Sequence, residues 1–319
     1  MACVCGFCRV ILADVGSRPN RSEQEEWRRG RPMGEQVRVG LIGVGSIGSH
    51  FTGKLRDEGY PLTVYDLDAA KVTQAVERGA VGAASPAEVT AQADVILLSL
   101  PGSPQVEAVM SGAEGVLAAL RPGQLVVDTG TTRVSTELLY HRLCAEQGAG
   151  YIDSPITWRQ HGLLLMVGGP EALYEQARPV LECISYQVRR VGEIGQGQAL
   201  KYVNQLLQAG QLAVACEAVE FARAAGLDPK LPQEYLGFAI PDVIYGDTFE
   251  GTGQLALHYK DLGYVLEHAH ELRASVPLTS MIHEVFKAVA VDGDASWFQP
   301  GIVTYWRRLN SGGSDAPEA

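Results

Sequence analysis

The sequence lacks an excess of positive charge. It contains 26 Lys and Arg residues against 37 Asp and Glu residues, which gives a formal net charge of -11 at pH 7. A protein that holds nucleic acid or another polyphosphate by bulk electrostatics needs the opposite balance. This class of partner is therefore excluded, whereas a small substrate, including a cationic one, is not.

The sequence also lacks long apolar runs. No run approaches the roughly 18 residues that a membrane-spanning helix needs, and residues 10–13 are too short a run for the core of a signal peptide. We therefore expect a cytoplasmic protein with no membrane partner. Residues 1–34, which turn polar and rich in Arg and Glu from residue 17, predict a disordered leader, with Met33 as an alternative start, and residues 311–319 predict a flexible tail.

Paired metal-ligand motifs are absent as well. Cys3, Cys5 and Cys8 form a CxCxxC pattern, but no second pair and no histidine lies nearby. Structural zinc sites need about four such ligands, so no metal is expected. The other three cysteines are scattered through segments that read as helical or buried, and we expect them to be small core residues.

What the sequence does have is alternation of short apolar runs with amphipathic segments. Near-continuous apolar strands joined through helices are typical of a parallel sheet covered on both faces. The candidate strands are VRVGLIG, LTVYD, DVILLSL, QLVVDTG, GYIDSP and LLLMVGG. After Gly197 these signals stop, and apolar residues recur at helical spacing until Gly226. Three further helical segments follow, at residues 232–240, 252–272 and 277–290. The prediction is an α/β Rossmann domain over residues 35–195 and an all-α C-terminal domain over residues 196–310, linked by a long interdomain helix.

A glycine-rich motif, GVGSIG at residues 43–48, follows the first predicted strand and opens a predicted helix. In this context Gly43 allows a tight turn, Gly45 lets the backbone approach a pyrophosphate, and Gly48 lets helix and strand pack closely. Ser46 and Ile47 begin the helix whose free N–H groups would bind phosphate oxygens. The motif predicts a dinucleotide site.

Asp66, at the end of the second predicted strand, selects between dinucleotides. A carboxylate there accepts hydrogen bonds from the ribose hydroxyls and repels a 2′-phosphate. No arginine follows it in residues 67–70. We therefore expect NAD as the cofactor rather than NADP.

The long helix after Gly197 carries a polar stripe on an otherwise apolar surface that predicts burial. Lys201, Asn204, Gln208 and Gln211 recur at spacings of three and four, so they share one face. One interpretation is a solvent-facing stripe. The other is a stripe that faces an internal cleft, where burial would lower the pKa of Lys201 and let it exchange a proton near neutral pH.

Six segments in order, GLIGVGSIG, SLPGSPQV, DTGTT, DSPIT, GQGQALKYVNQ and HYKDLGYVLEHA, resemble the β-hydroxyacid dehydrogenase family, which includes 3-hydroxyisobutyrate dehydrogenases and tartronate semialdehyde reductases and is related to 6-phosphogluconate dehydrogenase. The likeness covers residues 37 to about 292. It implies an NAD-dependent oxidoreductase that interconverts a small β-hydroxy acid and its aldehyde or ketone, and a homodimer or homotetramer formed through the helical domain.

The resemblance also implies roles for single residues. Lys201 matches the family's general acid/base, and Asn204 matches the residue that holds the substrate, with Gln205 or Gln208 as companions. Three residues would line the dinucleotide from the first domain: Leu100, Pro101 and Thr131. Lys260 would approach it from the helical domain, although a solvated lysine paired with Asp261 or Glu267 is the alternative.

The sequence departs from the family at the substrate loop. The family pattern D-A-P-V-S-G-G is replaced by DSPITWR, and the loop is several residues shorter. Thr157 keeps a hydroxyl where the family has serine, but Trp158 and Arg159 cannot reproduce the close backbone approach of two glycines. Three interpretations remain open. Arg159 could hold a carboxylate or phosphonate in a bidentate manner, or Trp158 could form an apolar or cation-binding wall for a larger substrate. In the third, Trp158 packs in the domain interface and Arg159 points into solvent. A second departure is Asp128-Thr129-Gly130-Thr131, where the family has Asp-x-Ser-Thr.

Two competing functions remain. Imine reductases share this architecture but lack the catalytic lysine, so Lys201 disfavours them. A non-catalytic dinucleotide-binding protein could also keep this fold, and it would bind NAD without turnover.

Overall fold

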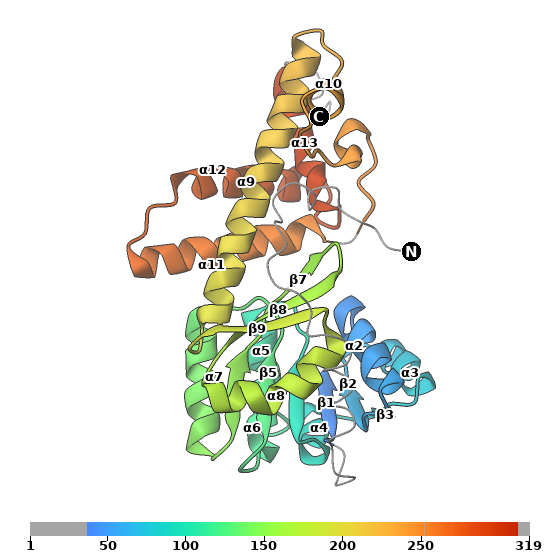
Figure 1. Ribbon diagram of the computed structural model, residues 1–319, viewed down its shortest axis with the longest axis vertical. Helices are drawn as coiled ribbons and strands as arrows, with labels where there is room; N and C mark the ends of the chain where they lie inside the picture. The colour runs from blue at the N-terminus through green and yellow to red at the C-terminus, as the bar shows by residue number, and fades with distance from the viewer. Residues whose placement is uncertain (1–36, 252, 312–319) are drawn as a thin grey trace, which may run out of the picture. The chain divides into compact units, whose positions relative to one another are not determined.

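The computed structural model describes residues 37–251 and 253–311 (Figure 1). The predicted leader, the CxCxxC cysteines, Met33 and nearly all of the predicted tail lie outside the described residues. The chain divides into two compact units, and the boundary between them falls after Lys201.

The first unit is built on a nine-stranded sheet in the order β3-β2-β1-β4-β5-β6-β8-β7, with β9 paired to β8. All pairs among β1 to β6 are parallel, whereas β8 runs antiparallel to β6 and β7 and parallel to β9. The strands are β1 (Val39–Ile42), β2 (Leu62–Tyr65), β3 (Val81–Gly82), β4 (Val95–Leu98), β5 (Leu125–Asp128), β6 (Gly150–Asp153), β7 (Ile156–Arg159), β8 (Gly162–Gly168) and β9 (Gln187–Gly192).

Helices cover both faces of this sheet, which explains why β1, β4, β5 and β6 are buried along their whole length. One core contains Phe51 and Leu55 and lies under α2 (Ser46–Asp57), α3 (Ala69–Glu77) and α8 (Glu171–Ile184). The other contains Tyr140 and Cys144. It lies under α4 (Pro86–Gln92), α5 (Ser103–Met110), α6 (Val116–Ala119) and α7 (Val134–Glu146).

The strand order reverses between β1 and β4. In an open parallel sheet, ligands bind beyond the carboxyl ends of the strands at such a switch point. The segments after β1, β4 and β5 therefore mark the expected ligand site of this unit.

The second unit is helical. Its core packs Cys216, Leu262, Phe286 and Ile302 together. The elements are α9 (Gln196–Ala224), which begins in the first unit, α10 (Leu231–Glu234), the 3₁₀ turn η2 (Asp242–Tyr245), α11 (Leu255–Leu272), α12 (Pro277–Asp292), the 3₁₀ turn η3 (Gln299–Ile302) and α13 (Val303–Asn310). In the described part of the chain, no helix has the length and apolar character to cross a membrane.

The predicted fold class is confirmed: a Rossmann-type sheet is followed by a helical unit, and one long helix joins them. The prediction missed three strands, β3, β7 and β9, and it was wrong at residues 232–240, where only a four-residue helix forms. Gly237, within this segment, has φ of 76°, in the left-handed region that a helix does not adopt. Cys144 and Cys216 are buried core residues as predicted, whereas Cys183 is only half-buried and packs against the edge of the first core.

Candidate functional site

The glycine-rich turn connects β1 to α2. Gly43 has φ of 94°, in the region that favours glycine, and a Cβ there would lie 2.3 Å from the Ser99 carbonyl oxygen. A Cβ on Gly48 would lie 2.0 Å from the Gly43 carbonyl oxygen. Gly45 differs from both, because a Cβ there would meet no atom within 4 Å. The protein's own packing requires glycine at positions 43 and 48 but not at position 45. The absence of a side chain at Gly45 therefore leaves open space beside the turn, where a ligand can approach the backbone.

This open space adjoins the start of α2. Gly45 is the N-cap of the helix and offers no side-chain hydrogen bond, and no acidic residue lies in the first turn, which Ser46 and Ile47 begin. The N–H groups of a first turn without a side-chain cap attract an anion. Both features fit the pyrophosphate of a dinucleotide.

Asp66 lies directly beside this turn. Its Oδ2 accepts a hydrogen bond of 2.8 Å from the Val44 N–H, and its Oδ1 accepts one of 2.9 Å from the Asp68 N–H. These bonds fix the carboxylate, and each oxygen keeps a second lone pair for a ribose hydroxyl. The following residue, Leu67, is 92% exposed, so no basic side chain covers the carboxylate at that position.

The segments after β4 and β5 meet the same turn. Leu100 Cδ2 would be 3.2 Å from a Cβ on Gly43, and the Leu100 carbonyl oxygen would be 2.7 Å from one on Gly130. Pro101 is exposed, and Thr131, directly after Gly130, is half-buried. The structure therefore brings together the predicted dinucleotide residues of the first unit at the switch point.

The first turn of α9 is anchored to the carboxyl ends of β5 and β6. Asp153 Oδ1 accepts a hydrogen bond of 2.7 Å from the Gly195 N–H, and its Oδ2 accepts one of 2.8 Å from the Gln198 N–H. Glycine is required for this approach, since a Cβ on Gly197 would lie 2.5 Å from Asp153 Oδ2. Lys201 follows one turn later and is only 9% exposed.

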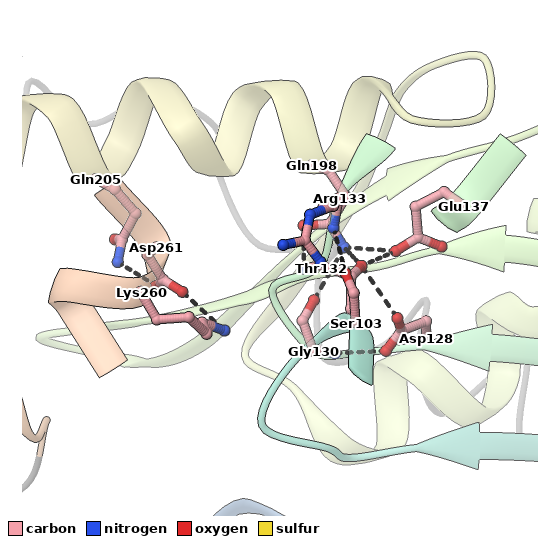
Figure 2. A network of polar contacts seen from close by, with 10 residues as sticks. All are labelled: Ser103, Asp128, Gly130, Thr132, Arg133, Glu137, Gln198, Gln205, Lys260 and Asp261. Carbon is pink, nitrogen blue, oxygen red and sulfur yellow. Dashed lines mark hydrogen bonds and ion pairs between the residues drawn. The ribbon is translucent and has the colours of Figure 1, made fainter. Parts of the chain in front are cut away.

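The side chain of Gln198 ties this turn to the segment after β5 (Figure 2). Its Nε2 donates to the Gly130 carbonyl oxygen at 3.0 Å and to Thr132 Oγ1 at 2.9 Å. In return its Oε1 accepts a hydrogen bond of 3.2 Å from the Thr132 N–H. The turn that carries Lys201 is thus held against the dinucleotide side of the first unit.

A second polar chain lies within the helical unit. Asn204 Nδ2 donates to Gln205 Oε1 at 2.9 Å, and Gln205 Nε2 donates to Asp261 Oδ2 at 2.6 Å. Asp261 Oδ1 pairs with Lys260 Nζ at 3.0 Å, a contact also drawn in Figure 2. Asn204 is buried and Gln208, one turn along, is half-buried. The pairing of Lys260 with Asp261 is the one expected of a structural lysine.

The segment that the sequence predicted to be a substrate loop is a strand. Residues Ile156–Arg159 form β7, which pairs with β8 as an antiparallel hairpin. Successive side chains of a strand point to opposite faces, so Thr157 and Arg159 share a face and Trp158 lies on the other. Arg159 Nη1 donates to Thr157 Oγ1 at 3.1 Å and to the Trp158 carbonyl oxygen at 3.0 Å, while Trp158, half exposed, packs edge-on against His50 of α2.

Sequence reasoning missed the buried Glu137, and it named Asp261 only as a possible partner of Lys260, not of Gln205. Glu137 on α7 is fully buried and accepts a hydrogen bond of 2.8 Å from Gln198 Nε2 across 61 residues of sequence. Asp261 forms the centre of the second polar chain. The spacing of Glu137 to Tyr140 and Cys144, three and seven residues, places it on the buried face of its helix, and this was the available signal.

Comparison with known proteins identifies the first unit as a dinucleotide-binding domain. Residues 38–192 match the family model described as the NAD binding domain of 6-phosphogluconate dehydrogenase, and residues 195–305 match the one described as NAD-binding of NADP-dependent 3-hydroxyisobutyrate dehydrogenase. The chain is 31% identical to 2-(hydroxymethyl)glutarate dehydrogenase of Eubacterium barkeri, over 87% of this chain and 97% of the relative. It is 31% identical to 2-hydroxy-3-oxopropionate reductase of Escherichia coli, over 84% of this chain and 96% of the relative.

A solved structure of Mycobacterium tuberculosis 3-hydroxyisobutyrate dehydrogenase with L-serine is similar as well. It has a TM-score of 0.77 and 26% sequence identity, over 86% of this chain and all of that one. The family models and these relatives identify an oxidoreductase that uses a nicotinamide dinucleotide, and the fold is the one such a protein needs. The chain belongs to the β-hydroxyacid dehydrogenase family, as its sequence motifs predict.

Proposed function

We propose that the protein is an NAD-dependent dehydrogenase of a small β-hydroxy acid, with Lys201 as the general acid/base. The observation that carries this proposal is the attachment of the first turn of α9, through the 3.0 Å bond from Gln198 Nε2 to the Gly130 carbonyl oxygen, to the segment beside the glycine-rich turn. Lys201 belongs to the same compact unit as that turn and is buried. An amine held there is suited to proton transfer beside a dinucleotide.

The bound dinucleotide supplies or accepts the hydride. In the oxidation direction, neutral Lys201 takes the proton of the substrate hydroxyl, and the electrons of the C–H bond leave with the hydride. In the reduction direction, the Lys201 ammonium gives a proton to the carbonyl oxygen. Asn204, three residues along the same helix, holds the substrate, with Gln208 one turn further on.

NAD is the proposed cofactor despite the reference to NADP in one matching family description. The support is the fixed carboxylate of Asp66 beside the turn, with no basic residue in the four positions that follow. A 2′-phosphate would bring two negative charges against this carboxylate. Gly43, Gly45, Ser46, Ile47 and Gly48 would hold the pyrophosphate. The remaining proposed contacts are Leu100, Pro101, Thr131 and Lys260.

For the substrate, we propose an acid whose carboxylate is held by Thr157 and Arg159. These residues share one face of β7, and the 3.1 Å hydrogen bond from Arg159 Nη1 to Thr157 Oγ1 supports joint contact of the guanidinium and the hydroxyl with one anion. Trp158 points to the other face and would form an apolar wall near His50. A planar guanidinium replaces the backbone cradle that two glycines would provide.

We also propose a homodimer or homotetramer built on α9. The sequence predicted burial over most of this helix, but one stripe of large apolar side chains is exposed by 40% to 72%: Leu200, Val203, Leu207, Val214 and Phe221. The spacings of three, four and seven residues place the stripe on one face, as in a helix that pairs with a second copy. Sedimentation of Leu207→Glu against wild type tests this assignment.

The activity is tested by a screen that follows reduced nicotinamide by its absorbance. β-Hydroxy acids are offered with NAD or NADP, and semialdehydes and cyclic imines with NADH or NADPH. Turnover of an acid or semialdehyde that is lost in Lys201→Ala supports the proposal. Turnover confined to imines would assign the chain to imine reduction, and tight NAD binding with no turnover would make it a binding protein.

A further inference from the structure

Three carboxyl groups are enclosed beneath the first turn of α9. Asp128 ends β5, Asp153 ends β6 at the paired position, and Glu137 lies on α7; each is 0% exposed. Asp153 has a structural role, because its two oxygens accept hydrogen bonds from the Gly195 and Gln198 N–H groups. Glu137 has no role in the chemistry proposed above. Burying a carboxyl group costs free energy unless its oxygens find hydrogen-bond partners, so its contacts need an explanation.

The contacts of Glu137 lead toward α9. Its Oε1 accepts the 2.8 Å hydrogen bond from Gln198 Nε2 and contacts the Thr132 hydroxyl. Thr132 Oγ1 also lies 3.2 Å from Asp128 Oδ2 (Figure 2). The hydroxyl therefore bridges two acids, while the Gln198 amide closes the network from the helix side.

This network surrounds the side chain of Gln198, in the turn of α9 that leads to Lys201. Gln198 is 0% exposed and is three residues before Lys201 on a continuous helix, so the two side chains share a face. Loss of the hydrogen bonds that the Gln198 side chain makes would let that turn shift and displace the amine. A misplacement of about 1 Å in a reacting group can cost roughly a hundredfold in rate.

We propose that Glu137 is a positioning residue for Lys201, acting through Thr132 and Gln198 to fix the first turn of α9. This inference rests on the proposed role of Lys201. Burial, and then the charges of Asp128 and Asp153, raise the pKa of the Glu137 carboxyl well above its ordinary value. With the carboxyl group neutral, its Oε1 still accepts from the Thr132 hydroxyl and from Gln198 Nε2.

The test measures kcat and the NAD dissociation constant for Glu137→Ala, Gln198→Ala, the double variant and Glu137→Gln. The first two variants should each lower kcat by about tenfold to a hundredfold with little change in NAD affinity. Because both act through one network, the double variant should lose no more than the worse single variant. Glu137→Gln keeps the acceptor oxygen and should stay within about threefold of wild type.

A matched control separates positioning from general loss of stability. Gln124 is 5% exposed, and its Nε2 donates to the Thr90 and Ala93 carbonyl oxygens at 2.7 and 2.6 Å, at the opposite end of β5. Gln124→Ala should lower the melting temperature without lowering kcat of the folded enzyme. A kcat loss in Glu137→Ala no larger than in this control, or losses that multiply in the double variant, would overturn the inference.

Two further variants distinguish failure of the positioning role from misfolding and from failure of the proposed function. If Glu137→Ala does not fold, Thr132→Val removes the bridging hydroxyl in a nearly isosteric side chain and should lower kcat at unchanged NAD affinity; an unchanged kcat overturns the inference. Lys201→Ala is measured alongside. Full activity in that variant defeats the proposed function itself, whereas its loss together with a normal Glu137→Ala defeats only the positioning role.

Discussion

The carboxylate of Asp66 and the N–H of Val44 are joined by a hydrogen bond of 2.8 Å, which ties the end of β2 to the glycine-rich turn. We expect Asp66→Ala to raise the Michaelis constant for NAD by about tenfold to a hundredfold, because charge-assisted hydrogen bonds to the ribose are lost. The same change should reduce discrimination against NADP. Steady-state kinetics with both cofactors measure this, and Asp68→Ala, which removes the N-cap side chain of α3, is the control that should leave the preference intact.

Gly45 gives a prediction that separates cofactor binding from folding. Its φ of -63° suits any residue, and a Cβ there meets no protein atom within 4 Å. Gly45→Ala should change the free energy of unfolding by no more than about 1 kcal/mol, yet weaken NAD by about tenfold or more because the methyl group occupies the pyrophosphate position.

The control lies on the same helix. A Cβ on Gly53 has Arg78 Nη1 as its nearest neighbour, at 3.8 Å, so Gly53→Ala should stabilise α2 by about 0.5 to 1 kcal/mol and leave NAD affinity unchanged. Titration calorimetry and urea unfolding measure both quantities. Equal NAD affinity in wild type and Gly45→Ala would rule out this pyrophosphate position.

Arg159 is expected to act on substrate binding rather than on the hydride step. Arg159→Ala should raise the Michaelis constant of the acid by about tenfold to a hundredfold with a smaller change in kcat. Arg159→Lys should recover only part of the loss, since an ammonium cannot bind a carboxylate in the bidentate manner. Unchanged constants in both variants would leave Arg159 with only its bonds to Thr157 and Trp158.

The buried acids predict a pH dependence of stability. Burial raises the pKa of Asp153 to about 7, and it raises that of Glu137 well above the ordinary value. The native state thus keeps protons that the unfolded chain releases above a pKa of about 4. The stability that these two groups contribute is fully present below the unfolded pKa, and it is lost as the pH rises through their pKa values in the native state.

Glu137→Gln removes one of these groups. Its stability relative to wild type should therefore increase from pH 5 to pH 8, by at most about 1.4 kcal/mol per pH unit. Urea unfolding across this range measures the difference. A constant difference would mean that Glu137 is ionised in the native state.

The sequence predicted those features that depend on neighbouring residues. GVGSIG and Asp66 belong to one strand–turn–helix–strand unit, so their spacing alone indicated the dinucleotide turn. The strand β9, with two arginines in six residues, gave no apolar signal and forms because it pairs with β8. Contacts such as Gln198 to Glu137 join residues 61 positions apart, and only the packing of α7 and α9 on the sheet brings them together.

The most direct test of the account is the kcat of Lys201→Ala at saturating NAD and hydroxy acid. We predict a loss of about a hundredfold to ten-thousandfold from removal of a general acid/base, an unchanged NAD dissociation constant, and partial recovery when primary amines are added in the order of their basicity. Lys287→Ala, which removes an exposed lysine of α12, should match wild type. A kcat of Lys201→Ala equal to that of wild type would contradict the account.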